Sequence, residues 1–392
     1  MPETELPQTD FEKQISEFAA RDQYRSLQAL PEAGGKITVD GEEVLNFSSN
    51  DYLNLSSHPA VIAGSQRAAS EYGCGSTASR LMTGNLDLHE ELEKELAQLV
   101  GQPAGLLFGS GFLTNVGVIT ALVGRGDAIF ADRLNHASLV DGARLSGATV
   151  HRYQHNDLDH LEKLLNDQTD HRRRVIVSDS LFSMDGDLAD IPRLSALAKQ
   201  SDCLLMVDEA HAIGIFGEGG GGLCRDLLPE GRPDVIVGTL GKALGCYGGF
   251  AACSETIRSL LINKARTFIY STALPPPTVG SALAALEVIK QSPDLGSELL
   301  RRARLLRDLL AEEGFALGES ESQIIPVMVG ENERAQEFSE ALKEEGLLAV
   351  AVRPPTVPEG TARLRLSVTL AHQEEDLEKA AGILGRVVGL SC

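Results

Sequence analysis

The sequence of 392 residues predicts an α/β fold, in which a mostly parallel central sheet is covered by helices on both faces and a smaller C-terminal α+β domain follows. The first observation behind this is a regular alternation of short apolar runs and helical stretches from Gly105 onward. The second is that polar residues come directly after several of these runs, where open α/β sheets bind their ligands. The third is a break in the pattern at Ser271–Pro277, after which a less regular group of elements begins.

Three elements are predicted before the alternation begins. Phe11 to Leu30 carries apolar residues at helical spacing and predicts an amphipathic helix. Residues 36–47 predict a hairpin with Asp40-Gly41 as its turn. Residues 86–100 predict a helix, because leucines form a stripe along one face and Asp87 favours the helix N-terminus.

The central sheet is predicted from seven apolar runs. They are residues 105–108, 128–131, 148–153, 174–179, 203–208, 235–239 and 250–253. The last two runs lie close together across a glycine-rich turn, so we expect one antiparallel strand. A helix over 278–313 follows, then strands near 322–329 and 362–368 and helices near 332–345 and 373–388. We expect three parts: an N-terminal helix and hairpin (1–50), a large α/β domain (51–290) and a C-terminal α+β domain (291–392).

Charge and composition narrow the class of partner. The formal net charge is −21, which argues against nucleic acid or an anionic membrane as the main partner. An anionic substrate would therefore need positive charge supplied locally by its site. No apolar run approaches about 20 residues, and the start lacks the apolar region of a signal peptide. Six scattered cysteines form no C-x-x-C pair, so we expect a cytoplasmic protein.

Two segments about thirty residues apart carry the strongest chemical signal. Asp208 and His211 follow one predicted strand, and Lys242, flanked by glycines, follows the next. A strand-end carboxylate and a desolvated lysine are what a pyridoxal phosphate site needs, since lysine binds the aldehyde and aspartate holds the pyridine nitrogen protonated. Taken alone, Asp208 could be a helix N-cap and Lys242 a surface lysine. A phosphate-binding NTPase loop is the rival interpretation, but the full G-x-x-x-x-G-K-[ST] pattern is absent.

Further polar residues follow other predicted strands. The turn 109–115 begins a helix and would direct its N–H groups at a phosphate. A strand–helix turn without any ligand would have the same kind of sequence. Thr239 could bind the same phosphate. His136 could stack on the pyridine ring or only cap a helix, and Ser183 could donate to the ring. In the C-terminal part, Arg363 and Arg365 share a strand face and could clamp a carboxylate, or simply be solvated.

These residues together resemble the α-oxoamine synthases, a fold-type I pyridoxal-phosphate family, over residues 25–390. The resemblance rests on the order and spacing of several motifs. They are Asn46–Leu53, Gly84–Glu93, Ser110–Phe112, Asp132–Ser138, Phe182–Asp187, Asp208–Gly214, Thr239–Gly245, Tyr270–Thr272 and Arg353–Leu366. The run Arg353–Pro358 most resembles the branch that works in biotin synthesis. Asn54 departs from the family, whose members commonly have glycine there.

The resemblance implies a role for each matched residue. Lys242, His136 and Asp208 would be catalytic, with Lys242 holding the cofactor aldehyde and moving the α-proton, Asp208 facing the ring nitrogen and His136 stacked on the ring. Ser183 and His211 would contact the phenolic oxygen. The phosphate would be bound by Gly111, Phe112, Thr239 and, across a dimer interface, Thr272. Substrate would be bound by Asn50, His136 and Arg365, with Arg25 and Thr356 as contacts of the acyl group or pantetheine.

The implied reaction is a decarboxylative condensation of L-alanine with a pimeloyl thioester, carried by CoA or by a carrier protein, to an amino ketone. A homodimer with its active site at the interface is implied as well, and no metal is expected. A sibling activity that uses glycine or serine with another acyl-CoA stays open. So does a catalytically dead partner subunit of the same fold, which the joint presence of Lys242, Asp208 and His136 argues against.

Overall fold

This computed structural model describes residues 8–31, 34–227 and 229–389. They form two compact units. The larger, unit 2, comprises Asn50–Arg301 and Glu321–Gln323. The smaller, unit 1, comprises the described residues up to Ser49, then Arg302–Ser320 and the described residues from Ile324 onward. The three-part division with boundaries after residues 50 and 290 stays a prediction.

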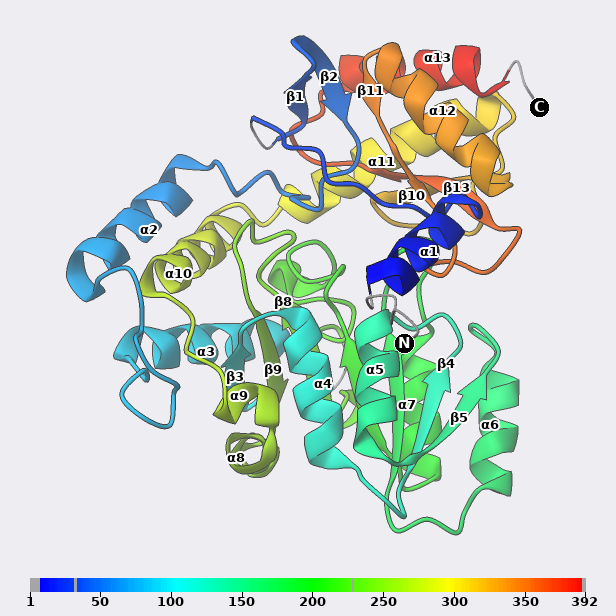
Figure 1. Cartoon of the computed structure of the whole chain (residues 1–392). Helices are drawn as coiled ribbons and strands as arrows, with labels where there is room; N and C mark the ends of the chain where they lie inside the picture. Colours follow the sequence, from blue (N-terminus) through cyan, green and yellow to red (C-terminus); the bar gives the residue numbers. More distant parts are fainter. Residues whose placement is uncertain (1–7, 32–33, 228, 390–392) are drawn as a thin grey trace, which may run out of the picture. The chain divides into compact units, whose positions relative to one another are not determined.

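Unit 2 is built on a seven-stranded sheet (Figure 1). In spatial order its strands are β3 (Ala104–Phe108), β9 (Gly249–Cys253), β8 (Val235–Thr239), β7 (Leu204–Asp208), β6 (Arg174–Asp179), β4 (Ala128–Asp132) and β5 (Thr149–Tyr153). Neighbours from β8 to β5 pair in parallel, and β9 runs antiparallel to both β8 and β3. This confirms the predicted mostly parallel sheet with one antiparallel strand. The carboxyl ends of β4, β6, β7 and β8 therefore meet at one edge.

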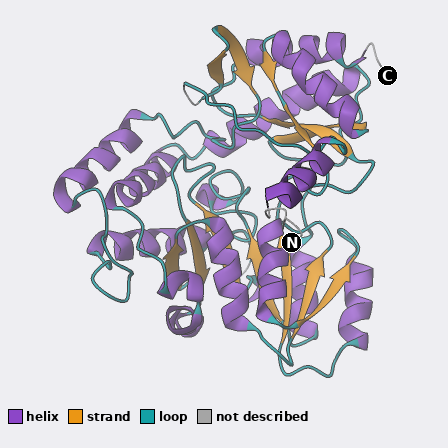
Figure 2. Cartoon of the chain, viewed as in Figure 1, coloured by secondary structure: helices purple, strands orange, loops and turns teal. Residues whose placement is uncertain are grey.

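Helices lie on both sides of this sheet (Figure 2). The helices of unit 2 are α2 (Pro59–Tyr72), α3 (Asp87–Val100), α4 (Gly111–Leu122), α5 (Ala137–Ser146), α6 (Leu158–Asp167), α7 (Ile191–Gln200), α8 (Glu255–Lys264), α9 (Arg266–Ile269) and α10 (Pro276–Gln291), with short 3-10 turns at Glu218–Gly220 and Pro229–Gly231. Of these, α2 and α10 pack against each other. A continuous apolar core joins the sheet to helices α4, α5, α8 and α9. Burial on both faces explains why inner strands such as β4 and β6 are largely apolar, whereas the edge strand β5 is partly exposed.

Two helix predictions need correction. The helix expected over 278–313 is two helices, α10 and α11 (Leu295–Glu312), because Pro293 forces the preceding Ser292 out of the helical conformation, to φ −131° and ψ 69°. The N-terminal helix is α1 (Gln8–Ala19) and ends well before Leu30. Shortly after its end Asp22 has a φ of +52°, which a helix cannot continue through.

Unit 1 is an α+β unit, as predicted. The hairpin β1 (Lys36–Val39) and β2 (Glu42–Asn46) turns at Asp40-Gly41, whose φ angles are both positive. A second sheet has the order β10 (Ile324–Gly330), β13 (Ala362–Ser367), β12 (Val350–Val352). The remaining elements are β11 (Leu347–Leu348), which pairs with β2, and helices α12 (Asn332–Glu344) and α13 (Glu374–Val387).

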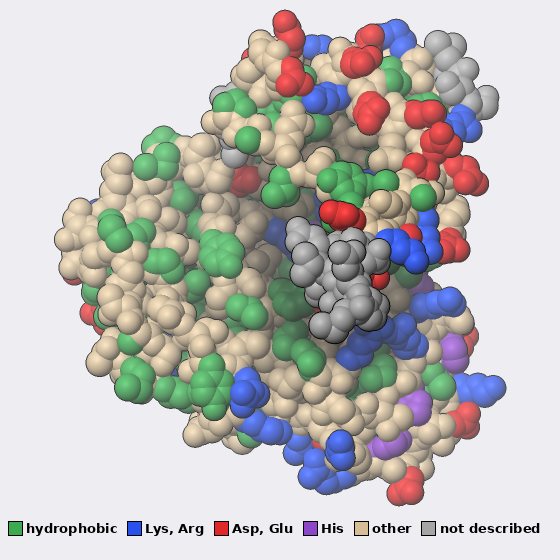
Figure 3. All heavy atoms as spheres, viewed as in Figure 1, with side chains coloured by type: hydrophobic (Ala, Val, Ile, Leu, Met, Phe, Trp, Pro, Cys, Tyr) green, Lys and Arg blue, Asp and Glu red, His purple; other side chains and the backbone are tan. Residues whose placement is uncertain are grey.

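Charge is unevenly distributed on the face shown in Figure 3. Asp and Glu side chains gather over the region of α12 and α13, whereas Lys and Arg gather over unit 2. On this face, acidic and basic side chains are therefore separated although the net charge of the chain is −21. Within the described residues, no helix combines the length and the apolar character that crossing a membrane requires.

Candidate active site

Lys242 lies in the turn that follows β8 and contacts a short chain of polar side chains. Its Nζ is 2.7 Å from Nε2 of His211, which follows the neighbouring strand β7. The other ring nitrogen of His211 is 2.7 Å from the hydroxyl of Tyr52, and this hydroxyl is 3.1 Å from Oδ1 of Asn50. The predicted residues Asn50, His211 and Lys242 are thus brought together, and Tyr52 links them.

Asp208 ends β7 and is buried. Its Oδ1 accepts a hydrogen bond of 2.8 Å from the Ala210 N–H, and its Oδ2 accepts one of 2.6 Å from the Asn115 amide. The same Asn115 amide donates to Ser138 Oγ at 2.8 Å. Two donors stabilise the ionised form of a buried carboxylate.

His136 stands immediately before α5, where it acts as the N-cap. Its backbone N–H donates to Asp179 at 2.8 Å, and its Nδ1 is 2.7 Å from Ser138 Oγ. Burial lowers the pKa of His136; the charge of Asp208 opposes this effect and that of Lys242 adds to it. The imidazole is therefore neutral at pH 7 and lies within electrostatic reach of both residues.

Asp179 is a second carboxylate at the same edge of the sheet. It is buried at the end of β6, directly opposite Asp208 in the register of β6 and β7. Burial, together with the charge of Asp208, raises the pKa of Asp179. The neutral form of Asp179 is therefore favoured by burial and by the neighbouring carboxylate.

The predicted phosphate site lies at the N-terminus of α4. Ser110 caps this 12-residue helix by accepting a hydrogen bond from Leu113 N at 3.2 Å. Gly111 lies against Thr239, since a Cβ on Gly111 would come within 3.5 Å of the Thr239 hydroxyl. That hydroxyl donates to the Gly248 carbonyl at 2.9 Å and accepts from Gly241 N–H at 3.2 Å. Helix-end N–H groups beside a hydroxyl fit a phosphate group.

The remaining cofactor candidates lie in turns. Phe112 is half exposed in the first turn of α4. Ser183 belongs to the turn 182–187 after β6, which the Phe182 N–H closes by donating to the Asp187 carbonyl at 3.0 Å. Thr272 pairs with Ser79 in an isolated bridge. Their expected contacts with a cofactor stay predictions.

The other three substrate-binding candidates belong to unit 1. Arg365 lies on the central strand β13, opposite Pro326 and Val350, and donates to Ser367 Oγ at 2.8 Å. The N–H of Thr356 donates to the Arg353 carbonyl at 3.1 Å. Burial and the nearby charge of Arg25 lower the pKa of Arg353, so two guanidinium groups lie close together in this unit.

Sequence reasoning missed several residues of the site. Asn115 and Ser138 connect Asp208 with His136, and Tyr52 extends the contacts of His211. The buried Gln323 donates to the His211 carbonyl at 2.9 Å. Asn115 carried one usable signal, since it lies one helical turn after Gly111 on the same face of α4. The described part of the chain holds no group of three or more His, Cys, Asp or Glu suited to a metal ion.

Comparison with known proteins agrees with this geometry. The family model for aminotransferase class I and II matches residues 42–384. A curated relative, 8-amino-7-oxononanoate synthase of Geobacter sulfurreducens, is 47% identical over 368 residues, which cover 93% of this chain and 94% of the relative. A solved structure of SPT with a PLP internal aldimine has a TM-score of 0.91 at 27% identity and 98% coverage of both chains. A crystal structure of 8-amino-7-oxononanoate synthase from Francisella tularensis has a TM-score of 0.75 at 28% identity, covering 88% of this chain and 97% of that one.

Proposed function

Since the chain belongs to the 8-amino-7-oxononanoate synthase family within the class I and II aminotransferase group, we propose that it condenses L-alanine with a pimeloyl thioester. The products are 8-amino-7-oxononanoate, carbon dioxide and free thiol, a step of biotin synthesis. The observation that carries the proposal is the contact of 2.7 Å between Lys242 Nζ and His211, beside the buried Asp208 at the adjacent strand end. The alternative is a sibling reaction with glycine or serine and another acyl-CoA.

Pyridoxal 5′-phosphate is the cofactor, and the residues fit it. The N-terminus of α4 at Gly111 and Phe112, with Thr239, would hold the phosphate, and Thr272 of a second copy would complete that contact. Asp208 would face the pyridine nitrogen, and the neutral His136 would lie on the ring. Ser183 and His211 would contact its phenolic oxygen. Bound pyridoxal phosphate supplies an electron sink for charge that develops at the amino acid Cα.

The chain's own groups handle the protons. Lys242 would hold the cofactor aldehyde, and its Nζ would remove and return the proton at the amino acid Cα. His211 contacts this Nζ at 2.7 Å and so restricts where the amine lies. Asp208, held by donors from Ala210 and Asn115, keeps a negative charge at one fixed place. A fixed charge needs no reorganisation during the reaction, which is how such groups lower a barrier.

Substrate recognition rests on arginines in an acidic chain. Arg365 would clamp the α-carboxylate of alanine bidentately, and Asn50 and His136 are the other residues proposed to contact the amino acid. Arg25 and Thr356 would contact the acyl donor, whose far carboxylate or pantetheine phosphate is anionic. The net charge of −21 makes such local positive charge necessary. We further propose a cytoplasmic homodimer whose active site includes residues of both copies.

Steady-state kinetics test the proposal. Alanine, glycine and serine would each be combined with pimeloyl, acetyl, succinyl and palmitoyl thioesters, on CoA and on a carrier protein. We expect the highest kcat/KM for alanine with a pimeloyl thioester. The highest value for glycine or serine with another thioester would assign the sibling reaction instead.

The Lys242→Ala variant is the control for the chemistry. It should lose at least about a hundredfold in turnover, because the proton-transferring amine is gone. Borohydride should link cofactor to the wild-type chain, detected as added mass, and not to this variant. An NTPase module or an inactive subunit would show no such link in the wild type either.

A further inference from the structure

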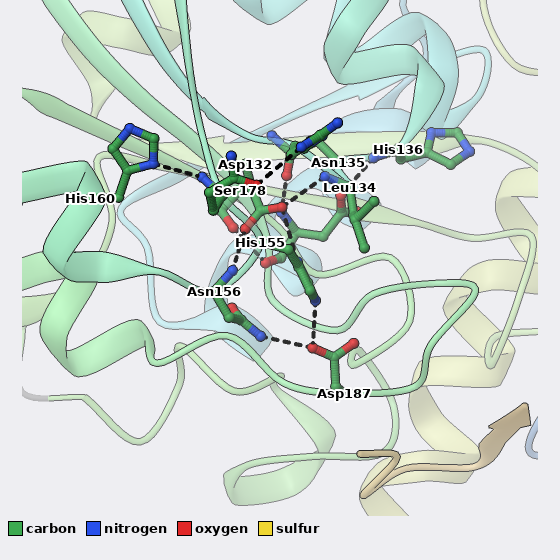
Figure 4. A network of polar contacts seen from close by, with 12 residues as sticks. Asp132, Leu134, Asn135, His136, His155, Asn156, His160, Ser178 and Asp187 are labelled. Atoms are coloured by element: carbon green, nitrogen blue, oxygen red, sulfur yellow. Dashed lines mark hydrogen bonds and ion pairs between the residues drawn. The ribbon is translucent and has the colours of Figure 1, made fainter. Parts of the chain in front are cut away.

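His155 connects the ends of three strands of the unit 2 sheet (Figure 4). It follows the edge strand β5, and its two ring nitrogens contact carboxylates from two other strand ends. Nδ1 is 3.0 Å from Asp132 at the end of β4, and Nε2 is 2.9 Å from Asp187 in the turn after β6. The neighbouring Asn156 makes the same two connections, donating from its backbone to Asp132 at 2.9 Å and from its amide to Asp187 at 2.7 Å.

Each carboxylate is built into a turn that carries a cofactor candidate. Asp132 also accepts from the Leu134 N–H at 2.8 Å, which closes the turn leading to His136. Asp187 ends the turn 182–187, which contains Ser183 and is closed by the Phe182 N–H donating to the Asp187 carbonyl. The His155 ring also meets the Phe182 ring edge-on, with centroids 4.4 Å apart. One imidazole therefore fixes the spacing between the turn of His136 and the turn of Ser183.

A protonated His155 offsets part of the negative charge of this arrangement. Both Asp132 and Asp187 are buried, and two buried carboxylates need a cation between them. Burial opposes charge on His155, but hydrogen bonds and charge from both carboxylates outweigh it and raise the pKa of His155 to about 10. The imidazolium form, which can donate from both nitrogens, is thus the stable one at neutral pH.

We propose that His155 is a positioning residue for the cofactor: it holds the turns of His136 and Ser183 at the spacing that the pyridine ring requires. This rests on the proposed function and names a determinant of cofactor binding in that same site. The two ring nitrogens of His155 contact Asp132 and Asp187, which belong to the two turns, so His155 acts through these turns (Figure 4). When a group that orients a binding residue without touching the ligand is removed, affinity or activity commonly falls by about tenfold or more.

The test compares His155→Gln, Asp187→Asn and the double variant with a matched control, His160→Gln. His160 lies five residues along the chain and contacts only the Gln154 backbone within the network. The full chain would be used throughout. We would measure the dissociation constant of pyridoxal phosphate, hydrogen exchange of segments 133–136 and 182–187 at saturating cofactor, and kcat and KM separately.

We expect His155→Gln to weaken cofactor binding about tenfold, to raise exchange in both segments, and to lower kcat more than the KM for amino acid. Asp187→Asn should act similarly, and the double variant should fall short of the sum of the two effects. His160→Gln should match the wild type. Asp187→Asn keeps the test decisive should His155→Gln not fold.

Wild-type cofactor affinity and exchange in His155→Gln, or in Asp187→Asn, would overturn the inference. A loss of stability with unchanged affinity would do the same, because it would leave His155 a structural clamp only. Failure of the wild-type chain to bind pyridoxal phosphate would instead refute the proposed function. The two failures are therefore distinguishable.

Discussion

At the scale of single residues, one amide joins two halves of the candidate site. Asn115 donates to Asp208 at 2.6 Å and to Ser138 at 2.8 Å, and Ser138 in turn contacts His136 at 2.7 Å. Asn115 therefore helps to position both Asp208, proposed to face the ring nitrogen, and, through Ser138, His136, proposed to lie on the ring face. A donor to a buried charged group is costly to remove, because the charge is left with fewer partners.

Replacing Asn115 with alanine should lower kcat/KM by roughly 10- to 100-fold while the fold is retained, since a hydrogen bond to a charged group contributes about 1.5–3 kcal/mol. The measurement is steady-state kinetics at saturating cofactor, with far-ultraviolet circular dichroism to check the fold. Thr120→Ala is a suitable control, because this hydroxyl on the same helix only contacts backbone carbonyls. Equal losses in both variants would show that α4 is disturbed as a whole and that the Asn115 amide has no special part.

Glu209, next to Asp208, gives a prediction about pH. It is fully buried, and burial raises its pKa to about 7 from 4.5, although hydrogen bonds from Cys224 and others oppose the rise. Because the pKa is higher in the folded state, protonation of Glu209 favours folding. Its contribution to the free energy of unfolding is therefore complete below pH 4.5 and is lost as the pH rises to about 7. In Glu209→Gln that loss should be absent. Urea unfolding at several pH values measures this. The free energy of unfolding of the variant should rise relative to that of the wild type between pH 4.5 and about 7, by no more than about 3 kcal/mol. A difference between the two proteins that does not change with pH would contradict the raised pKa of Glu209.

The sequence predicted the candidate residues that directly follow strands. It missed residues that reach the candidate site only through the tertiary fold. Lys242, Asp208, His211 and His136 each follow an apolar run, so the rule that ligands bind at carboxyl ends of parallel strands selected them as candidates. Asn115 lies on a helix that is buried nearly all round, so its spacing of one helical turn from Gly111 is the one feature that could have pointed to it. Gln323 comes from a segment more than a hundred positions away from His211 in the chain, and no local pattern predicts such a contact.

At the scale of elements, long periodic segments were predictable and short ones were not. Inner strands of the large sheet such as β4 and β6 are buried on both faces, which makes their apolar runs easy to recognise. The edge strand β5 is partly exposed. Strands β11 and β12, of two and three residues, are too short to show a period. Asn54 illustrates a local rule that does hold: its φ is +54°, a conformation that favours glycine and that asparagine tolerates better than most residues.

The close contact between the start of β9 and the start of α4 gives a prediction at this scale. A Cβ added to Gly249 would lie 2.6 Å from the Gly111 nitrogen and 2.5 Å from the Thr114 hydroxyl, so the start of α4 would have to move. Gly249→Ala should therefore destabilise the protein by about 1–3 kcal/mol and also weaken binding of pyridoxal phosphate. Gly124→Ala, near the other end of α4, should do neither, because its nearest neighbour is 3.8 Å away. Urea unfolding and cofactor titration measure both effects, and normal cofactor affinity in Gly249→Ala would argue against a phosphate at this helix end.

At the scale of the whole molecule, exposed apolar residues of unit 2 supply a surface for the homodimer that we propose. The segments 79–82 and 270–272 lie side by side, since Ser79 pairs with Thr272 and Ala273 N–H donates to the Ala78 carbonyl at 3.0 Å. We call the surface formed by these two segments the Met82–Tyr270 surface. Met82 is 77% exposed on it and Tyr270 is 71% exposed. Large apolar side chains gathered at one place mark an interaction surface. Thr272, proposed to reach the cofactor phosphate of the other copy, belongs to the same segments.

Met82→Glu should therefore separate the dimer and weaken cofactor binding together, because a buried unpaired carboxylate opposes association and the separated copies lose the Thr272 contact. Analytical ultracentrifugation should give twice the chain mass of 41.9 kDa for the wild type and the single mass for the variant. Leu145→Glu is the control, since Leu145 is 69% exposed at the end of α5, outside this surface, and its charge should leave the dimer intact. A wild-type monomer with full cofactor affinity would contradict the shared site. A monomeric Met82→Glu variant with unchanged affinity would keep the dimer but remove Thr272 from the phosphate, because dimer formation and cofactor binding would then be independent.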